Sequence, residues 1–172
     1  FFYNMEVGFS EDLSLLQLND HPEPKSMFNE KYPFFTSSSN YMKVHFKEYA
    51  EWMNKKYLKS KSNLIEIGSN DGTFLKNFNN TSINAFGYEP SKNVADKAIS
   101  DGIKTYNRFF NLENIELIKE YYNKIDVICA SNVICHIPDL NDLVSSIDKL
   151  LTSTGVFIFE EPYMGSMFEK VS

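Results

Sequence analysis

Short apolar segments alternate with polar segments along most of the chain. After residue 60 the strand-like runs are NLIEIG, NAFGYEP, KTY, KIDVICAS and GVFIFEE. The polar stretches between them include two with helix-compatible sequence, residues 91–100 and 139–151. This alternation predicts an α/β fold of Rossmann-like type, with a mostly parallel sheet sandwiched by helices. In such a fold the ligand site lies beyond the carboxyl ends of the central strands.

The first sixty residues have a different pattern. HPEP at 21–24 and TSSS at 36–39 are loop-forming combinations, and they predict an irregular lead-in over the first forty residues. From Asn40 to about Lys59, apolar and aromatic side chains recur at helical spacing. We expect a helix there, capped by Asn40.

Composition narrows the possible partners. The 172 residues carry a formal net charge of -6, and Arg108 is the only arginine, so no basic stripe is available to bind nucleic acid. No apolar run approaches the roughly 20 residues that cross a bilayer, so we expect no membrane partner. The two cysteines, Cys129 and Cys135, lie in apolar sequence and form neither a disulfide framework nor a metal motif. A cytoplasmic protein fits best.

The stretch LIEIGSNDGTFL, residues 64–75, predicts a strand, a glycine-rich turn and a helix. Two nucleotide-binding motifs do not fit it. The dinucleotide fingerprint G-x-G-x-x-G fails because Asn70 and Thr73 stand where its second and third glycines belong. A phosphate-binding P-loop would need a Lys-Ser/Thr pair, which is absent.

Charge around this turn suggests another ligand. Glu66, Asp71 and Glu89 would repel a pyrophosphate but suit a ligand with a sulfonium and an ammonium, such as S-adenosylmethionine. Gly68 and Gly72 allow close approach of the backbone. The Glu66 carboxylate could bind the methionyl ammonium directly or through water. The Glu89 carboxylate, at the end of the second strand, could accept hydrogen bonds from both ribose hydroxyls. For the turn alone, a glycine turn with two solvated acids is the favoured interpretation. The turn, the acid after the second strand and the alternating pattern together favour the methyl donor.

Three further segments carry a closer likeness: MFNEKYPFFTSSS at 27–39, SNVICHIPDL at 131–140 and FEEPYMGSMFEKVS at 159–172. Together with LIEIGSNDG and GYEPSKNVA, they resemble the sugar C-methyltransferases of deoxysugar biosynthesis, in particular those that methylate C3 of nucleotide-linked 4-keto-6-deoxysugars. The resemblance implies the class I S-adenosylmethionine-dependent methyltransferase fold. It also implies proton removal at C3 next to the C4 ketone, an enolate, and transfer of the methyl group to that carbon.

The resemblance assigns catalytic roles to His136, in its ICHIP-type motif, and to Tyr32, in its YPF motif. A histidine just after the fourth strand would lie near the methyl donor, where an imidazole suits a general base. The alternatives are a histidine hydrogen-bonded at a strand end and a tyrosine packed against Phe34 and Phe35. Further cofactor contacts are expected from the residues around these motifs: Ser69, Asn70, Pro90, Phe110 (against adenine) and Asn132 (at the methionyl part). Phe110 and Asn132 could equally have structural roles.

Ser37 and Ser38 are expected to bind substrate or to cap their loop. The expected substrate is a nucleotide-sugar, and the sequence does not predict an oligomeric state.

The chain departs from the resembled family at both ends. Where members carry a second Cys-x-x-Cys pair, this sequence has Ser10 and Leu13, so we expect no zinc and no other metal. We interpret residues 1–39 as the remnant of an N-terminal module and linker, and residues 40–172 as the cofactor-binding domain. The whole is expected to be a fragment with an incomplete sheet of about five strands. The alternative functions are an O- or N-methyltransferase and a non-catalytic cofactor-binding remnant.

Overall fold

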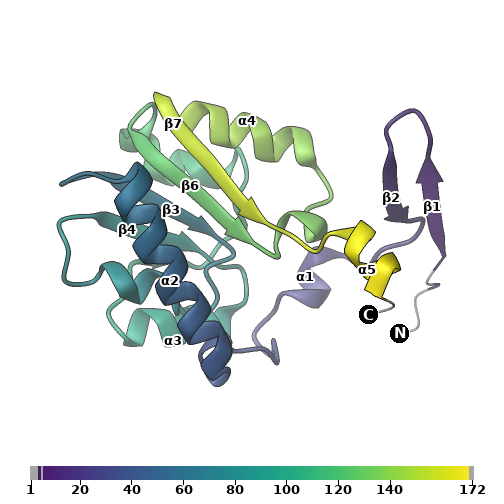
Figure 1. Cartoon of the computed structure of the whole chain (residues 1–172), viewed down its shortest axis with the longest axis horizontal. Helices are drawn as coiled ribbons and strands as arrows, with labels where there is room; N and C mark the ends of the chain where they lie inside the picture. The colour runs from purple at the N-terminus through teal and green to yellow at the C-terminus, as the bar shows by residue number, and fades with distance from the viewer. Residues whose placement is uncertain (1–3, 5, 171–172) are drawn as a thin grey trace.

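The computed structural model describes residue 4 and residues 6–170 (Figure 1). Its centre is a five-stranded parallel sheet in the order β5-β4-β3-β6-β7. The strands are β3 (Asn63–Ile67), β4 (Asn84–Tyr88), β5 (Thr105–Tyr106), β6 (Ile125–Ser131) and β7 (Leu151–Glu160). The expected α/β fold is confirmed. The strand order reverses at β3, which creates a crevice beyond the carboxyl ends of β3, β4 and β6.

Helices cover both faces of the sheet, and α2 and α4 lie on opposite sides (Figure 1). One core joins the sheet to α2 (Asn40–Tyr57), α3 (Lys92–Ser100) and the 3-10 helix η2 (Leu75–Phe78). The other core joins it to η3 (Asn114–Tyr121) and α4 (Leu140–Leu150). Successive side chains of β3 pack into opposite cores, since Leu64 belongs to the first core and Ile65 to the second.

Helix α2 begins where the sequence predicts it, but its cap is a different residue. The Ser39 hydroxyl accepts a hydrogen bond from the Met42 amide at 3.3 Å, so Ser39 caps the helix and Asn40 is its first residue. Phe46, Ala50 and Met53 repeat at helical spacing and are buried against the sheet.

The regular helix expected after the glycine-rich turn is replaced by the four-residue η2. The Asn77 side chain donates hydrogen bonds to the carbonyls of Thr73 and Phe74, and Thr81 bonds back to Phe78. Such local side-chain bonds compete with the helical ladder, which explains the short 3-10 segment.

The expectation of an irregular lead-in is wrong for part of the first forty residues. Strands β1 (Val7–Ser10) and β2 (Leu15–Leu18) form an antiparallel hairpin, which stands apart from the main sheet in Figure 1. Short helical segments follow at α1 (Pro24–Met27) and η1 (Thr36–Ser38). Ser10 and Leu13 stand where the resembled family has its second pair of cysteines. Ser10 ends β1 and Leu13 lies in the hairpin turn, where its amide donates a hydrogen bond to the Ser10 hydroxyl at 3.4 Å.

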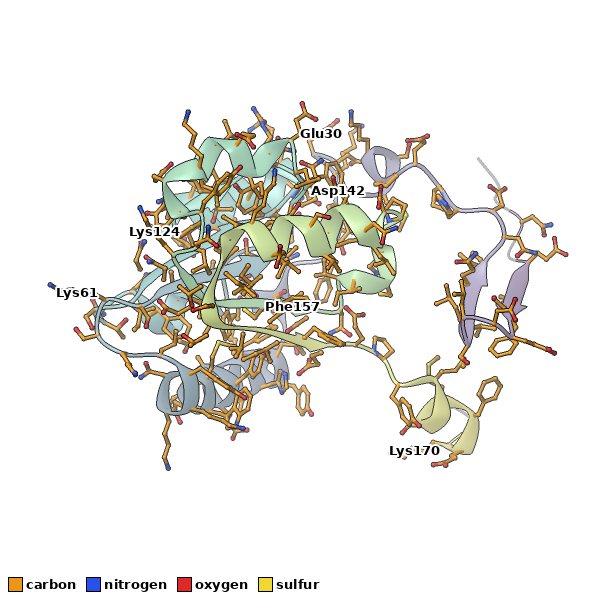
Figure 2. All side chains as sticks on the ribbon, turned by 90° about the horizontal axis from the view of Figure 1, so that it is seen from above. Glu30, Lys61, Lys124, Asp142, Phe157 and Lys170 are labelled. Atoms are coloured by element: carbon orange, nitrogen blue, oxygen red, sulfur yellow. The ribbon has the colours of Figure 1, made fainter. Side chains whose placement is uncertain are left out.

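The remaining short elements are η4 (Ile134–His136) and α5 (Met164–Lys170). Figure 2 shows Lys61 and Lys124, which precede β3 and β6, at the end of the molecule opposite Lys170 of α5. The carboxyl ends of the strands therefore face the part of the chain that holds α1 and η4. Within residues 4 and 6–170, no helix has the length and apolar character needed to span a membrane.

Candidate active site

A cavity of about 780 Å³ lies at the carboxyl ends of β3, β4 and β6. Segments distant in sequence line it: residues 23–36, the turn after β3, the end of β4, residues 109–111 and the turn after β6. Of the predicted site residues, those that line it are Tyr32, Gly68, Asn70, Glu89, Pro90, Phe110, Asn132 and His136. The structure thus brings both predicted catalytic residues together with much of the predicted cofactor site.

The turn after β3 is held against the end of β4. The amides of Gly68 and Ser69 both donate to the Tyr88 carbonyl, at 2.8 and 3.0 Å. Gly68 has φ +68°, and a Cβ there would lie 2.4 Å from Val133 Cγ2. A side chain at Gly68 would therefore be strained and would collide with the turn after β6.

Glu89 is fixed at the edge of the cavity. Its Oε2 accepts a hydrogen bond from the Asn70 amide at 3.0 Å, and its Oε1 accepts one from the Ser91 amide at 2.7 Å. Burial raises the pKa of the Glu89 carboxyl, although the bonds from Ser91 and Asn70 act in the opposite direction. Each carboxylate oxygen keeps room for another donor, so Glu89 can still accept hydrogen bonds from a ligand in the cavity.

Two other predicted acids lie behind the turn and do not line the cavity. The fully buried Asp71 accepts hydrogen bonds from the Ser37 amide and the Thr73 hydroxyl. Glu66 is 5% exposed, and its Oε2 is buried without a hydrogen-bond partner. Burial, followed by the charges of Glu89 and Asp71, raises the pKa of Glu66 well above its ordinary value. Glu66 is therefore not placed for direct contact with a ligand in the cavity.

Three aromatic rings lie together on the wall formed by residues 28–32 and η4. The Phe28 ring is 5.5 Å from the Tyr32 ring and 5.8 Å from the His136 imidazole, measured between centroids. Burial, and secondly the charge of Glu89, raises the pKa of Tyr32, so its phenol stays protonated near neutral pH. Tyr32 is therefore suited to donate a hydrogen bond, whereas His136 is exposed and can exchange protons with solvent.

The segment before α2 is tied to the turn after β3. Amides of Thr36 and Ser37 donate to the side chains of Asn70 and Asp71, each at 2.9 Å. The Ser38 hydroxyl donates to the Phe35 carbonyl at 2.7 Å. Ser37 and Ser38 do not line the cavity, so the structure supports loop roles and does not bring them to a substrate. The division of domains at residue 39 stays a prediction.

Ser69 and Gly72 also lie away from the cavity. The Ser69 side chain points to β4, where a Cβ on Gly87 would lie 2.2 Å from its hydroxyl oxygen. Gly72 packs against Ile103 and Ala98. Their roles are thus in shaping the turn.

Phe110 and Asn132 are placed at the cavity by different means. Phe110 is buried edge-on against Tyr88, with the ring centroids 5.3 Å apart. Asn132 has φ +56°, and its amide donates to the Glu160 carbonyl at 2.7 Å. This left-handed residue turns the chain from β6 toward η4, and asparagine tolerates that conformation better than most residues.

Sequence reasoning did not single out Phe28 and Asp142. Phe28 lies within the quoted segment 27–39, but nothing in its spacing shows that it would contact His136. Asp142, labelled in Figure 2, is in the first turn of α4 and accepts a hydrogen bond from the Leu112 amide at 3.1 Å. Among the described residues, no cluster of three His, Cys, Asp or Glu side chains is arranged to hold a metal ion.

Comparison with known proteins gives a family and a relative. A model of the family described as "Methyltransferase domain" matches residues 41–171. The C-methyltransferase NovU of Streptomyces niveus is 29% identical over 101 residues, which make up 59% of this chain and 24% of NovU. The chain therefore spans about a quarter of the length of this curated relative.

Solved structures of similar fold include an S-adenosyl-L-methionine-dependent methyltransferase from Methanococcus maripaludis. It has a TM-score of 0.62 and 16% identity, over 88% of this chain and 76% of that chain. The carbon methyltransferase CurJ has a TM-score of 0.55 and 18% identity, over 69% of this chain and 34% of that chain. The fold is therefore that of the Rossmann-like S-adenosylmethionine-dependent methyltransferases, as the sequence predicts.

Proposed function

The chain belongs to the methyltransferase domain family, and from this membership we propose that its cavity binds S-adenosylmethionine beside His136 and Tyr32. The observation that carries the proposal is Glu89. It is a buried acid at the end of β4 that lines the same cavity as Gly68, Tyr32 and His136. The protein is accordingly an S-adenosylmethionine-dependent methyltransferase domain.

The residues present fit this cofactor. Gly68 lines the cavity without a side chain, so a ligand can approach its backbone there, while Val133 covers the side where a Cβ would stand. The Glu89 carboxylate oxygens can accept hydrogen bonds from the ribose hydroxyls, while Pro90 and Phe110 offer apolar surface to adenine. The unpartnered Oε2 of Glu66 provides a buried acceptor behind the turn, which can act on the methionyl ammonium through water.

The reaction we propose is methylation of carbon in a nucleotide-linked 4-keto-deoxysugar, at C3. It is supported by the five motifs that resemble the sugar C-methyltransferases and by the 29% identity with the C-methyltransferase NovU. S-adenosylmethionine supplies an electrophilic methyl group on its sulfonium. His136 would remove the C3 proton, and the electron pair of that C–H bond would form the enolate. C3 would then bond to the methyl carbon as the methyl–sulfur bond breaks, and S-adenosylhomocysteine would leave with that electron pair on its sulfur.

Tyr32 has the complementary role. A tyrosine phenol is protonated near neutral pH, and the pKa of Tyr32 is raised further, so it can donate a hydrogen bond to the C4 carbonyl oxygen as negative charge develops there. Phe28 packs against both catalytic side chains and limits their motion. The proton taken by His136 returns to solvent, to which the ring is exposed.

Deuterium exchange tests this chemistry directly. The protein, saturated with S-adenosylhomocysteine, is incubated in D2O with a nucleotide-linked 4-keto-6-deoxyglucose, and mass spectrometry follows deuterium at C3. We expect exchange by the wild type and a loss of about 10²-fold or more in His136→Gln, because general bases contribute that much. His21→Gln, a change of an exposed histidine outside the cavity, should exchange like the wild type.

The other outcomes identify the alternatives. Methyl transfer to a small molecule without exchange at carbon would indicate an O- or N-methyltransferase. Binding of S-adenosylhomocysteine with neither exchange nor transfer would indicate a non-catalytic cofactor-binding protein. Either result contradicts the proposed C-methylation.

A further inference from the structure

Two adjacent acids at the end of β7 point to different neighbours. The Glu160 carboxylate contacts His45 of α2, with Oε2 2.9 Å from the imidazole Nε2. The Glu161 carboxylate contacts the turn between β6 and η4, which leads to His136. The side chain of Glu161 is therefore free of the α2 face and is committed to the turn that carries the proposed base.

Glu161 holds this turn by its backbone. Its Oε1 accepts hydrogen bonds from the amides of Val133 at 2.8 Å and Ile134 at 2.6 Å. The preceding amide, of Asn132, donates to the Glu160 carbonyl at 2.7 Å. Three successive amides are thus bonded to the end of β7, two of them to one carboxylate oxygen. Hydrogen bonds to an ionised acceptor are among the stronger ones in proteins.

The Glu161 carboxylate is fixed in a partly buried position. Its Oε2 is buried without a hydrogen-bond partner among the described residues. The Cys135 thiol lies beside the carboxylate, and burial followed by interaction with Glu161 raises the pKa of this thiol to about 11. The two amide hydrogen bonds that Oε1 accepts therefore hold the Glu161 carboxylate in this position, although its Oε2 has no partner among the described residues.

Val133 and Ile134, whose amides bond to Glu161, lie three and two residues before His136. The His136 amide donates to the Val133 carbonyl, and the Ile137 amide to the Ile134 carbonyl, both at 3.0 Å. These bonds form the single turn η4, so the position of Val133 and Ile134 determines where the His136 backbone lies. Val133 also packs on Gly68 of the cofactor turn.

The geometry points to Glu161 as the positioning residue for His136, because its carboxylate fixes the turn that aims the imidazole into the cavity. This inference rests on the proposed function only for the role of His136 as the base. It assigns Glu161 no contact with substrate, cofactor or the reacting atoms. Its effect is transmitted through the backbone of Val133 and Ile134.

The test compares Glu161→Ala and Glu161→Gln with Glu160→Gln, which changes the neighbouring side chain on the α2 face. In Glu161→Ala, we expect hydrogen exchange at the Val133 and Ile134 amides to rise at least tenfold, and the NMR signals of the His136 ring to shift. Glu161→Gln keeps an acceptor oxygen, so its amide protection should be intermediate. Glu160→Gln should retain wild-type protection of both amides.

Deuterium exchange at C3 of the ketosugar gives the functional readout. Glu161→Ala should lower its maximal rate at least tenfold, while the half-saturating substrate concentration changes less than threefold. Unchanged amide protection in Glu161→Ala, or lost protection with an unchanged maximal rate, would overturn the inference. A wild type without C3 exchange would contradict the proposed C-methylation instead, and the amide and His136 signals would then decide whether Glu161 positions the turn.

Discussion

At the scale of single residues, the site depends on carboxyl groups that the fold keeps away from water. Glu66 faces the α2 side of the sheet, since it lies opposite Cys129 in the register of β3 and β6. Its pKa is raised by burial and by the charges of Glu89 and Asp71. Its Oε2 has no hydrogen-bond partner among the described residues that would offset these effects, so folding shifts the Glu66 equilibrium toward the protonated form.

This raised pKa gives the stability of the protein a defined pH dependence. A carboxyl whose folded pKa exceeds its unfolded value, about 4.3 for Glu, binds more protons in the folded state. Its favourable contribution is complete below the unfolded pKa and is lost as pH rises through the folded pKa. Glu66→Gln cannot ionise, so its free energy of unfolding should fall less than that of the wild type between pH 5 and pH 8.

Urea denaturation of both proteins at several pH values measures this effect. Asp96→Asn, a change on the exposed side of α3, serves as the control and should follow the wild type. Parallel stability curves for Glu66→Gln and wild type would contradict the assignment of a raised pKa to Glu66.

At the scale of elements, the turn after β3 and the turn after β6 are fitted to each other at Gly68. Gly102 provides a matched comparison, because it has φ +82° but a Cβ added there would have no atom within 4 Å, whereas a Cβ at Gly68 meets Val133. Gly102→Ala should cost about 1 kcal/mol for the left-handed backbone alone. Gly68→Ala should cost that amount and a further 1–3 kcal/mol, roughly, for overpacking.

Thermal or urea unfolding of the two variants measures the difference. The double variant Gly68→Ala/Val133→Ala should recover most of the additional cost, since it removes the colliding methyl groups. Equal losses in Gly68→Ala and Gly102→Ala would show that the two turns are not packed as described.

The sequence predicts the elements best where periodicity is strong. The strands around NLIEIG and KIDVICAS and the helix from residue 40 follow from apolar spacing, because these segments bury one or both faces. The hairpin β1–β2 was missed, since its strands have four residues each and leave Val7 and Phe9 exposed. The prediction of a regular helix after the turn was wrong because the side chain of Asn77 hydrogen-bonds to nearby backbone carbonyls, and a hydropathy pattern does not reveal such bonds.

Residues of the candidate site could be predicted only where they belong to a recognisable sequence motif. Gly68, Glu89 and His136 each occupy a recognisable place relative to a strand end, and all three line the cavity. The roles of Glu161 and Phe28 depend on contacts between distant parts of the sequence. The Glu161 carboxylate contacts amides 27 and 28 positions earlier in the chain, and the Phe28 ring contacts His136, 108 positions later. No local pattern predicts such contacts. Glu66 was assigned to the cofactor from the charge around the turn and Ser37 to a ligand from its hydroxyl, but neither side chain lines the cavity in the folded chain.

At the scale of the whole molecule, the cavity exists because segments far apart in the sequence meet at one edge of the sheet. Residues 23–36 close over the carboxyl ends of β3 and β4, and the turn after β6 completes the wall. The net charge of -6 and the acids at the cavity suit a cofactor with positive groups. The central claim is therefore that this cavity binds the methyl donor and that Glu89 is part of the binding site.

Calorimetric titration with S-adenosylhomocysteine tests that claim most directly, with Asp96→Ala as the control variant and NADH as the control ligand. We predict saturable binding by the wild type and Asp96→Ala, no binding of NADH, and at least tenfold weaker binding by Glu89→Ala, about 1.4 kcal/mol. Circular dichroism melting of each variant shows that it is folded. A cooperatively folded wild type that does not bind S-adenosylhomocysteine, or a folded Glu89→Ala that binds it equally well, would contradict the claim.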